Sequence, residues 1–132
     1  MFVHISSKSI AAIRAHAAKT PDIEVCGLLF GTAECINAAQ PCANVADTPA
    51  TMFEIDPAAL IAAHKAQRAG GAKLIGHYHS HPNGVCAPSA TDAESADNVG
   101  QYWLIIAGAE IGLWYVTAPH VFAECAFEVG DF

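Results

Sequence analysis

The sequence predicts an α/β fold, a mixed β-sheet with helices packed on its faces, in one domain spanning residues 1–132. Its 132 residues, 53% hydrophobic and 14% charged, are typical of a chain that folds around one sizeable core and not of a disordered tail. Strand-like apolar runs are interspersed with three helix-like segments along this chain. A mixed sheet covered by helices buries the apolar faces of both kinds of element.

The first third of the chain predicts a strand, a helix and a second, more deeply buried strand. Residues 2–5 alternate weakly, and a helix then begins at Ser6 or Ser7, whose hydroxyl is a good cap, and runs to about Lys19. Residues 24–31 form a nearly continuous apolar run, which is typical of a strand buried on both faces. The acidic residue that opens this run is unusual in such a place.

The middle of the chain predicts two weaker strands and a second helix. Residues 34–46 indicate a broken strand, and residues 50–55 indicate another short one. Asp56-Pro57 places a capping carboxylate and a first-turn proline at the start of a helix that runs to Arg68 and stops at Gly70-Gly71.

The last part of the chain predicts a strand, a third helix and a β-rich end. The third helix begins at Ser89 and runs to about Asn98. The predicted strands share β-branched and aromatic content, and two of them form a hairpin. They cover residues 73–79, 102–107, 111–116 and 121–129.

Composition excludes several classes of partner. The formal net charge of −7 argues against nucleic acid, which needs a basic surface to neutralise phosphates. No window approaches the ~18 consecutive apolar residues of a membrane span, and the N-terminus turns polar before a secretory signal could form. Five cysteines without a scaffold pattern are expected to be free thiols, which indicates the cytoplasm. We separately expect a monomer or small homo-oligomer.

Two histidines at the end of the strand over 73–79 suggest a metal site. Because strand side chains alternate, His79 and His81 point the same way, and the carboxylate of Asp92 follows a short loop. Imidazole and carboxylate are zinc ligands, and three protein ligands leave a fourth position for water. Glu24 lies at the mouth of a buried strand, where desolvation raises a carboxyl pKa toward the range of a general base.

Each of these residues also has a structural explanation when it is taken alone. A histidine pair at strand spacing is often half-exposed surface, and Ser89-x-x-Asp92 is a capping pattern for the third helix. Glu24 alone would be a solvated strand end. A capping register also holds the Asp92 carboxylate rigid, so the capping and ligand interpretations are compatible.

The combined pattern resembles the JAMM (MPN+) zinc metalloprotease family. Its signature is a glutamate, a distant H-[S/T]-H-P, then a serine and an aspartate at fixed spacing. This chain has E-x-C-G-L-L from Glu24 and H-S-H-P from His79. Seven residues then separate His81 from Ser89, and two separate Ser89 from Asp92. The chain is similar in particular to the prokaryotic single-domain members, which share its length.

The resemblance implies a role for each matching residue. His79, His81 and Asp92 would bind one zinc ion per chain, Glu24 would be the general acid/base, and Ser89 would donate a hydrogen bond to the oxyanion. It also implies the three-layer α/β/α mixed sheet of the JAB/MPN domain, which is shared with cytidine deaminases. The implied reaction is hydrolysis of an amide or isopeptide bond at the C-terminal tail of a ubiquitin-like or sulfur-carrier protein.

Two residues near the histidine pair depart from the family pattern. His77 stands where the family often has a bulky aromatic residue, and we interpret it as a core residue or one that supports a ligand. Cys86 lies in the loop before Ser89, where it is a harmless loop residue, a competing ligand or a redox-sensitive inhibitor; we prefer the first. The loop is too compact for the insertions with which eukaryotic relatives grip ubiquitin chains.

Other functions fit the residues less well than the peptidase. A metallo-β-lactamase-like hydrolase needs an aspartate two residues after the second histidine, where this chain has Asn83. A non-catalytic MPN scaffold that binds metal or partners is the main alternative, although such members have lost ligands and this chain has lost none. A zinc nucleoside deaminase needs H-x-E and P-C-x-x-C, and neither occurs here. A cysteine peptidase using Cys26 or Cys86 is disfavoured, because Cys26 lies in an apolar strand where a thiolate is unstable.

Overall fold

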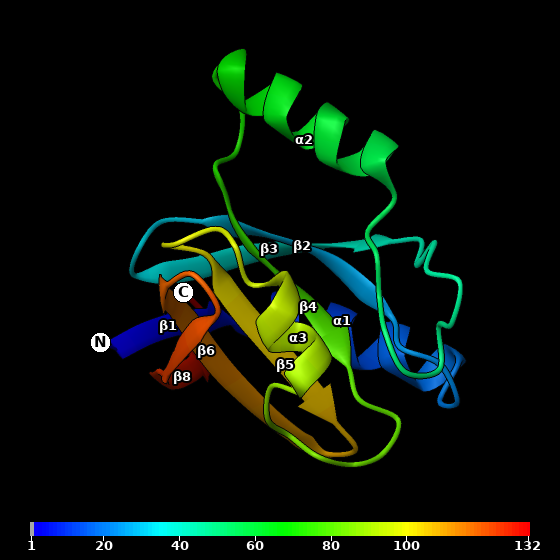
Figure 1. The fold of residues 1–132 in the computed structure, drawn as a ribbon. Helices are drawn as coiled ribbons and strands as arrows, with labels where there is room; N and C mark the ends of the chain where they lie inside the picture. Colours follow the sequence, from blue (N-terminus) through cyan, green and yellow to red (C-terminus); the bar gives the residue numbers. More distant parts are fainter. Residues whose placement is uncertain (1) are drawn as a thin grey trace.

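The computed structural model describes residues 2–132, so Met1, which the predicted domain includes, lies outside the described part. Its helices and strands follow one another as shown in Figure 1. They are β1 (Phe2–Ser6), α1 (Ser7–Lys19), β2 (Cys26–Gly31), β3 (Cys35–Cys42), α2 (Pro57–Arg68), β4 (Leu74–Ser80), α3 (Ala90–Ser95), β5 (Tyr102–Ala107), β6 (Glu110–Ala118), β7 (Val121–Glu124) and β8 (Ala126–Gly130). Within residues 2–132, no helix has the length and apolar character needed to cross a membrane.

All eight strands form one mixed sheet in the order β7-β6-β5-β4-β2-β3-β1-β8. The pairs β1–β3, β1–β8 and β4–β5 are parallel, and the remaining pairs are antiparallel. Helix α1 packs Ile10 and Ile13 into the core on one face, whereas Ala63 of α2 and Ala96, directly after α3, join separate clusters of buried side chains. The predicted α/β class, with helices on both faces of a mixed sheet, is confirmed.

The sheet is strongly curled. Strands β7 and β8 are its two edges, yet only Cys125 separates them in the sequence. A flat sheet of eight strands would hold its edges about 34 Å apart, a distance that one residue cannot span. The edges therefore approach each other at Cys125, which is buried and donates its backbone N–H to the carbonyl of Leu113.

Several element boundaries differ from the prediction. The expected strand over 121–129 is two strands that pair with β6 and β1. The expected broken strand over 34–46 is instead continuous from Cys35 to Cys42. Strand β1 pairs only with Cys35 and Ile36, so no strand beside Pro41 on the β1 side needs the N–H that proline lacks. The expected strand over 50–55 is reduced to one bridge, Asn44 to Ile55.

Two further boundaries bear on the site. Helix α3 ends at Ser95 and not near residue 98, and the chain then turns through Gly100, whose φ is 91°. Strand β2 begins at Cys26, so Glu24 lies just before the strand and not within it. Glu24 is nevertheless buried, as the apolar run predicted.

Candidate metal centre

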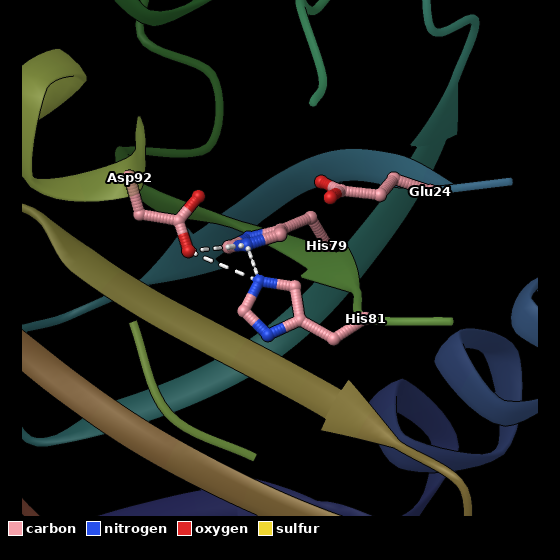
Figure 2. Close-up of side chains that lie close together, drawn as sticks. All are labelled: Glu24, His79, His81 and Asp92. Carbon is pink, nitrogen blue, oxygen red and sulfur yellow. Dashed lines mark hydrogen bonds and ion pairs between the residues drawn. The ribbon is translucent and has the colours of Figure 1, made fainter. Parts of the chain in front are cut away.

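Four side chains from three parts of the fold converge at one point. Glu24 precedes β2, His79 and His81 lie at the end of β4, and Asp92 lies in α3. All four are buried, and one potential ligand atom of each lies within 4.8 Å of those of the other three. In Figure 2 the two imidazoles and Asp92 share dashed lines, while the Glu24 carboxylate extends toward them without one. The sequence predicted each of these four residues.

Strand β4 delivers both histidines to one face. It lies between β2 and β5, and His79 is in register with Cys26 on one side and Ile105 on the other. Ser80 projects to the opposite face, where its Oγ accepts the N–H of Val25 at 2.8 Å. The N–H of His81 is bonded to the Ile106 carbonyl at 2.9 Å. The backbone hydrogen bonds of this strand and of His81 therefore fix the positions from which both imidazoles project.

Helix α3 fixes Asp92 through a complete capping box. Asp92 Oδ2 accepts the N–H of Ser89 at 2.9 Å, and Ser89 Oγ accepts the N–H of Asp92 at 3.0 Å. The same Oδ2 lies 3.2 Å from His79 Nε2 and 3.0 Å from His81 Nε2. The capping and ligand interpretations of this residue are thus compatible in the structure.

The donor set fits a metal cation. His81 Nδ1 donates to the carbonyl of Val85 at 2.7 Å, which leaves the Nε2 lone pair of the neutral imidazole directed at the cluster. The Nε2 atoms of His79 and His81 are 2.9 Å apart, and the buried His79 Nδ1 has no partner within residues 2–132. Ligands of a tetrahedral zinc ion lie about 3.3 Å from one another. Two imidazoles and a carboxylate at nearly this spacing make a site for one divalent ion.

Electrostatics keep the Asp92 carboxylate charged. Burial raises its pKa, but in the metal-free protein hydrogen bonds from His79 and from protonated His81 outweigh burial and hold the pKa well below its usual range. Burial also lowers the pKa of His79, and this favours the neutral imidazole that a metal requires. Burial likewise lowers the pKa of His81, but the hydrogen bonds to Asp92 and Val85 reverse the net shift upward.

Glu24 is held beside the cluster by its backbone and not by its carboxylate. Its N–H donates to the Pro49 carbonyl at 2.7 Å, and its carbonyl accepts from Asn44 Nδ2 at 2.8 Å. Its buried Oε1 has no hydrogen-bond partner within residues 2–132. Burial raises the pKa of Glu24 to about 7, with a lowering contribution from His81 and a raising one from Asp92. A carboxylate with a near-neutral pKa is suited to general acid and base chemistry.

The other residues singled out in the sequence have distinct surroundings. Ser89 is exposed, and because its hydroxyl oxygen accepts the Asp92 N–H, its own proton is free to donate; its oxyanion role stays a prediction. His77 is half-buried, with its ring centroid 4.3 Å from that of Trp103, and burial lowers its pKa to about 3, so its imidazole is neutral. The Cys86 thiol donates to the carbonyl of Ile105, and the side chain packs against the buried residues around Trp103.

Sequence reasoning missed the neighbours that support the site. The Phe53 ring stacks on His79 with centroids 4.3 Å apart and also lines an adjacent cavity of about 350 Å³. Asn44 anchors Glu24, and the backbone carbonyl of Val85 orients His81. Their roles depend on how the segments 43–55 and 82–88 fold back, and no local residue pattern signals that.

Several known proteins are similar to this chain in sequence. The family model of prokaryotic homologs of the JAB domain matches residues 6–118, a range that contains all four cluster residues and Ser89. A desampylase from Haloferax volcanii is 40% identical over 94 residues, which are 70% of this chain and 68% of that protein. A probable TtuB-protein conjugate cleaving protease from Thermus thermophilus is 39% identical over 83 residues, which are 63% of this chain and 55% of that protein.

A solved structure agrees with the predicted fold family. A JAB1/MPN domain protein from Archaeoglobus fulgidus has a TM-score of 0.60 to this chain at 18% identity, covering 96% of each. At this identity the likeness concerns the fold alone. It confirms the three-layer JAB/MPN architecture that the sequence resemblance implied.

Proposed function

Because this chain belongs to the family of prokaryotic homologs of the JAB domain, we propose that it is a zinc-dependent peptidase of the JAMM type, acting at the C-terminal tail of a ubiquitin-like or sulfur-carrier protein. The observation that carries the proposal is the buried cluster of two imidazoles and two carboxylates at the strand end. Similarity to a desampylase and to a TtuB-protein conjugate cleaving protease supports the substrate class.

The ligand atoms for zinc are His79 Nε2, His81 Nε2 and Asp92 Oδ2, which lie closest together. Bound zinc supplies Lewis acidity toward a water molecule and toward the scissile carbonyl. The capping box holds Asp92, and Val85 holds the tautomer of His81, so little reorganisation accompanies binding.

Glu24 and Ser89 perform the remaining steps. Glu24 takes a proton from the water that attacks the carbonyl carbon, and it returns that proton to the leaving nitrogen as the C–N bond breaks. A pKa of about 7 suits both transfers, because neither protonation state is strongly favoured at neutral pH. The Ser89 hydroxyl donates a hydrogen bond to the carbonyl oxygen as negative charge develops there.

We also propose the setting in which this chemistry takes place. Residues 1–132 act as one domain, as a monomer or small homo-oligomer in the cytoplasm, without a nucleic-acid or membrane partner. Five unpaired cysteines support a reducing compartment, and the net charge of −7 disfavours nucleic acid.

Metal content and hydrolysis, measured together, test the function. We expect wild-type protein to retain about one zinc per chain after dialysis, and to release the partner from a ubiquitin-like C-terminal fusion. Asp92→Ala should lose both zinc and activity. Glu24→Gln should keep zinc and lose activity by roughly 100- to 10,000-fold, since it removes only the proton transfer.

Two outcomes would contradict the proposed function, and each contradicts a different part of it. Wild-type protein without stoichiometric zinc contradicts the metal site itself. Wild-type protein that binds zinc but cleaves no ubiquitin-like or sulfur-carrier fusion supports the non-catalytic scaffold instead.

A further inference from the structure

Helix α3 carries Asp92 but is too short to hold itself in place. It has six residues, whereas isolated helices shorter than ~12–15 residues are marginal in water. Its N-terminus is closed by the Ser89 capping box and the Ala96 N–H caps the Ala93 carbonyl at 3.2 Å, but its last turn contains no basic residue to interact with the final carbonyls. A helix this short depends on contacts from outside to hold its C-terminal end.

That contact comes from the turn between β6 and β7. The backbone N–H of His120 donates to the Ala96 carbonyl at 2.8 Å, and its Nδ1 lies 2.8 Å from the Ala93 carbonyl. Because a carbonyl can only accept, Nδ1 carries the proton and donates it. His120 Nε2 also lies 3.7 Å from Asp97 Oδ1. One residue from a distant hairpin thus binds the Ala93 carbonyl in the last turn of α3 and contacts both Ala96 and Asp97, which follow the helix.

His120 adopts this position in an unfavourable backbone conformation. Its φ is 65°, the left-handed region where glycine is favoured, and no other non-glycine residue within residues 2–132 has a positive φ. Glycine would satisfy the turn and form the same backbone bond to Ala96. Only a side chain supplies the second bond, to Ala93.

We propose that His120 is a positioning residue for the metal centre, which holds α3 so that Asp92 Oδ2 meets the two imidazoles. The proposal rests on the proposed zinc site and deepens it. The connection is short: Ala93, whose carbonyl His120 binds, is the residue directly after Asp92, and its N–H donates to the Ser89 carbonyl at 3.0 Å. Loss of the side-chain bond frees the end of α3 and spreads the Asp92 carboxylate over several positions.

The test compares three substitutions with wild type. His120→Gly keeps the turn conformation and the backbone bond but removes the side-chain bond, and His120→Ala removes the bond and keeps the backbone strain. In His120→Asn the new residue tolerates a positive φ and retains an N–H donor, so this variant should keep part of the side-chain bond to α3. His64→Ala, which removes an exposed histidine of α2, is the matched control.

Two measurements separate this role from a general structural one. In metal-free protein, hydrogen exchange at the amides of Asp92, Ala93 and Ala96 should become about 10-fold faster in the Gly and Ala variants, while the urea midpoint of His120→Gly stays near that of wild type. Zinc competition should show a Kd raised about 10-fold in both variants, a smaller rise in the Asn variant and none in His64→Ala.

The outcomes distinguish this inference from the proposed function. Unchanged exchange in the Gly variant, or faster exchange with an unchanged zinc Kd, overturns the positioning role while the zinc site stands. Wild-type protein that binds no zinc overturns both, even where the exchange result shows that His120 holds the helix.

Discussion

Glu24 is the residue whose surroundings most constrain what the site can do. Its backbone N–H and carbonyl are hydrogen-bonded to Pro49 and Asn44, which fix the position from which the buried carboxylate extends. Its Oε1 has no hydrogen-bond partner within residues 2–132, and the favourable contribution of His81 to the charged form does not offset the hydration lost on burial. A proton is therefore held more tightly at this carboxylate in the folded chain than in the unfolded chain.

This linkage predicts a pH effect on stability in the metal-free protein. The folded pKa of about 7 exceeds the ordinary 4.5, so the stability that Glu24 contributes is present below about pH 4.5 and is lost as pH rises through 7. Glu24→Gln is neutral throughout. Relative to wild type, its free energy of unfolding should rise by about 1–2 kcal/mol between pH 4 and 8, after allowance for solvent screening.

Urea unfolding with a chelator present, at pH 4 and pH 8, measures this difference. Glu34→Gln is the control, because Glu34 is exposed and its replacement should leave the pH dependence as in wild type. If Glu24→Gln follows the wild-type pH dependence, Glu24 is not held in a desolvated state.

At the scale of elements, the site joins one strand end and one helix start. The alternation of β4 and the capping pattern of α3 are both local in sequence, and so His79, His81 and Asp92 could be predicted as ligands. A residue that acts through a contact distant in sequence could not be predicted in this way. His120 has no companion in sequence, and its contact with Ala93 exists only because the β6–β7 turn reaches α3.

Ser89 caps α3, and a substitution can separate this capping role from the oxyanion role that we propose for its hydroxyl. Glycine is a tolerable N-cap that costs only a few tenths of a kcal/mol, but it lacks the hydroxyl. Ser89→Gly should therefore keep zinc and the helix while kcat falls roughly 100- to 1,000-fold, the usual loss for one oxyanion donor.

Zinc content and kcat on the ubiquitin-like fusion, measured on the same samples, check this expectation. Ser89→Thr keeps both the cap and the hydroxyl, and it should stay within about 10-fold of wild type. Equal activity in the Gly and Thr variants would restrict Ser89 to capping α3.

At the scale of the whole molecule, a change of strand pairing at Cys125 brings the two edges of the sheet together, and no local pattern encodes this closure. Residues 121–129 contain no glycine or proline that would divide them, and they are predicted as one strand. In the structure the first four residues pair with β6 and the later ones with β1, and the exchange takes place at Cys125. Which edges a strand can reach depends on the curl of all eight strands. The class of fold was therefore predictable from the sequence, and its closure was not.

This closure predicts that β8 stabilises a site to which it contributes no residue. Strand β8 pairs with all five residues of β1, where Val3 and Ile5 are fully buried, and Phe132 packs its ring 4.2 Å from His4. A chain ending at Cys125 exposes that core, so its free energy of unfolding should fall by about 3–5 kcal/mol, a large share of the 5–15 kcal/mol typical of a domain. A chain ending at Gly130 keeps β8 and should lose less than about 1 kcal/mol.

Urea titrations followed by circular dichroism measure the stability of both shortened chains. Zinc binding should disappear along the same transition, because one sheet carries the core and the ligands. Full stability of the chain ending at Cys125 would mean that the sheet does not need its closing strand.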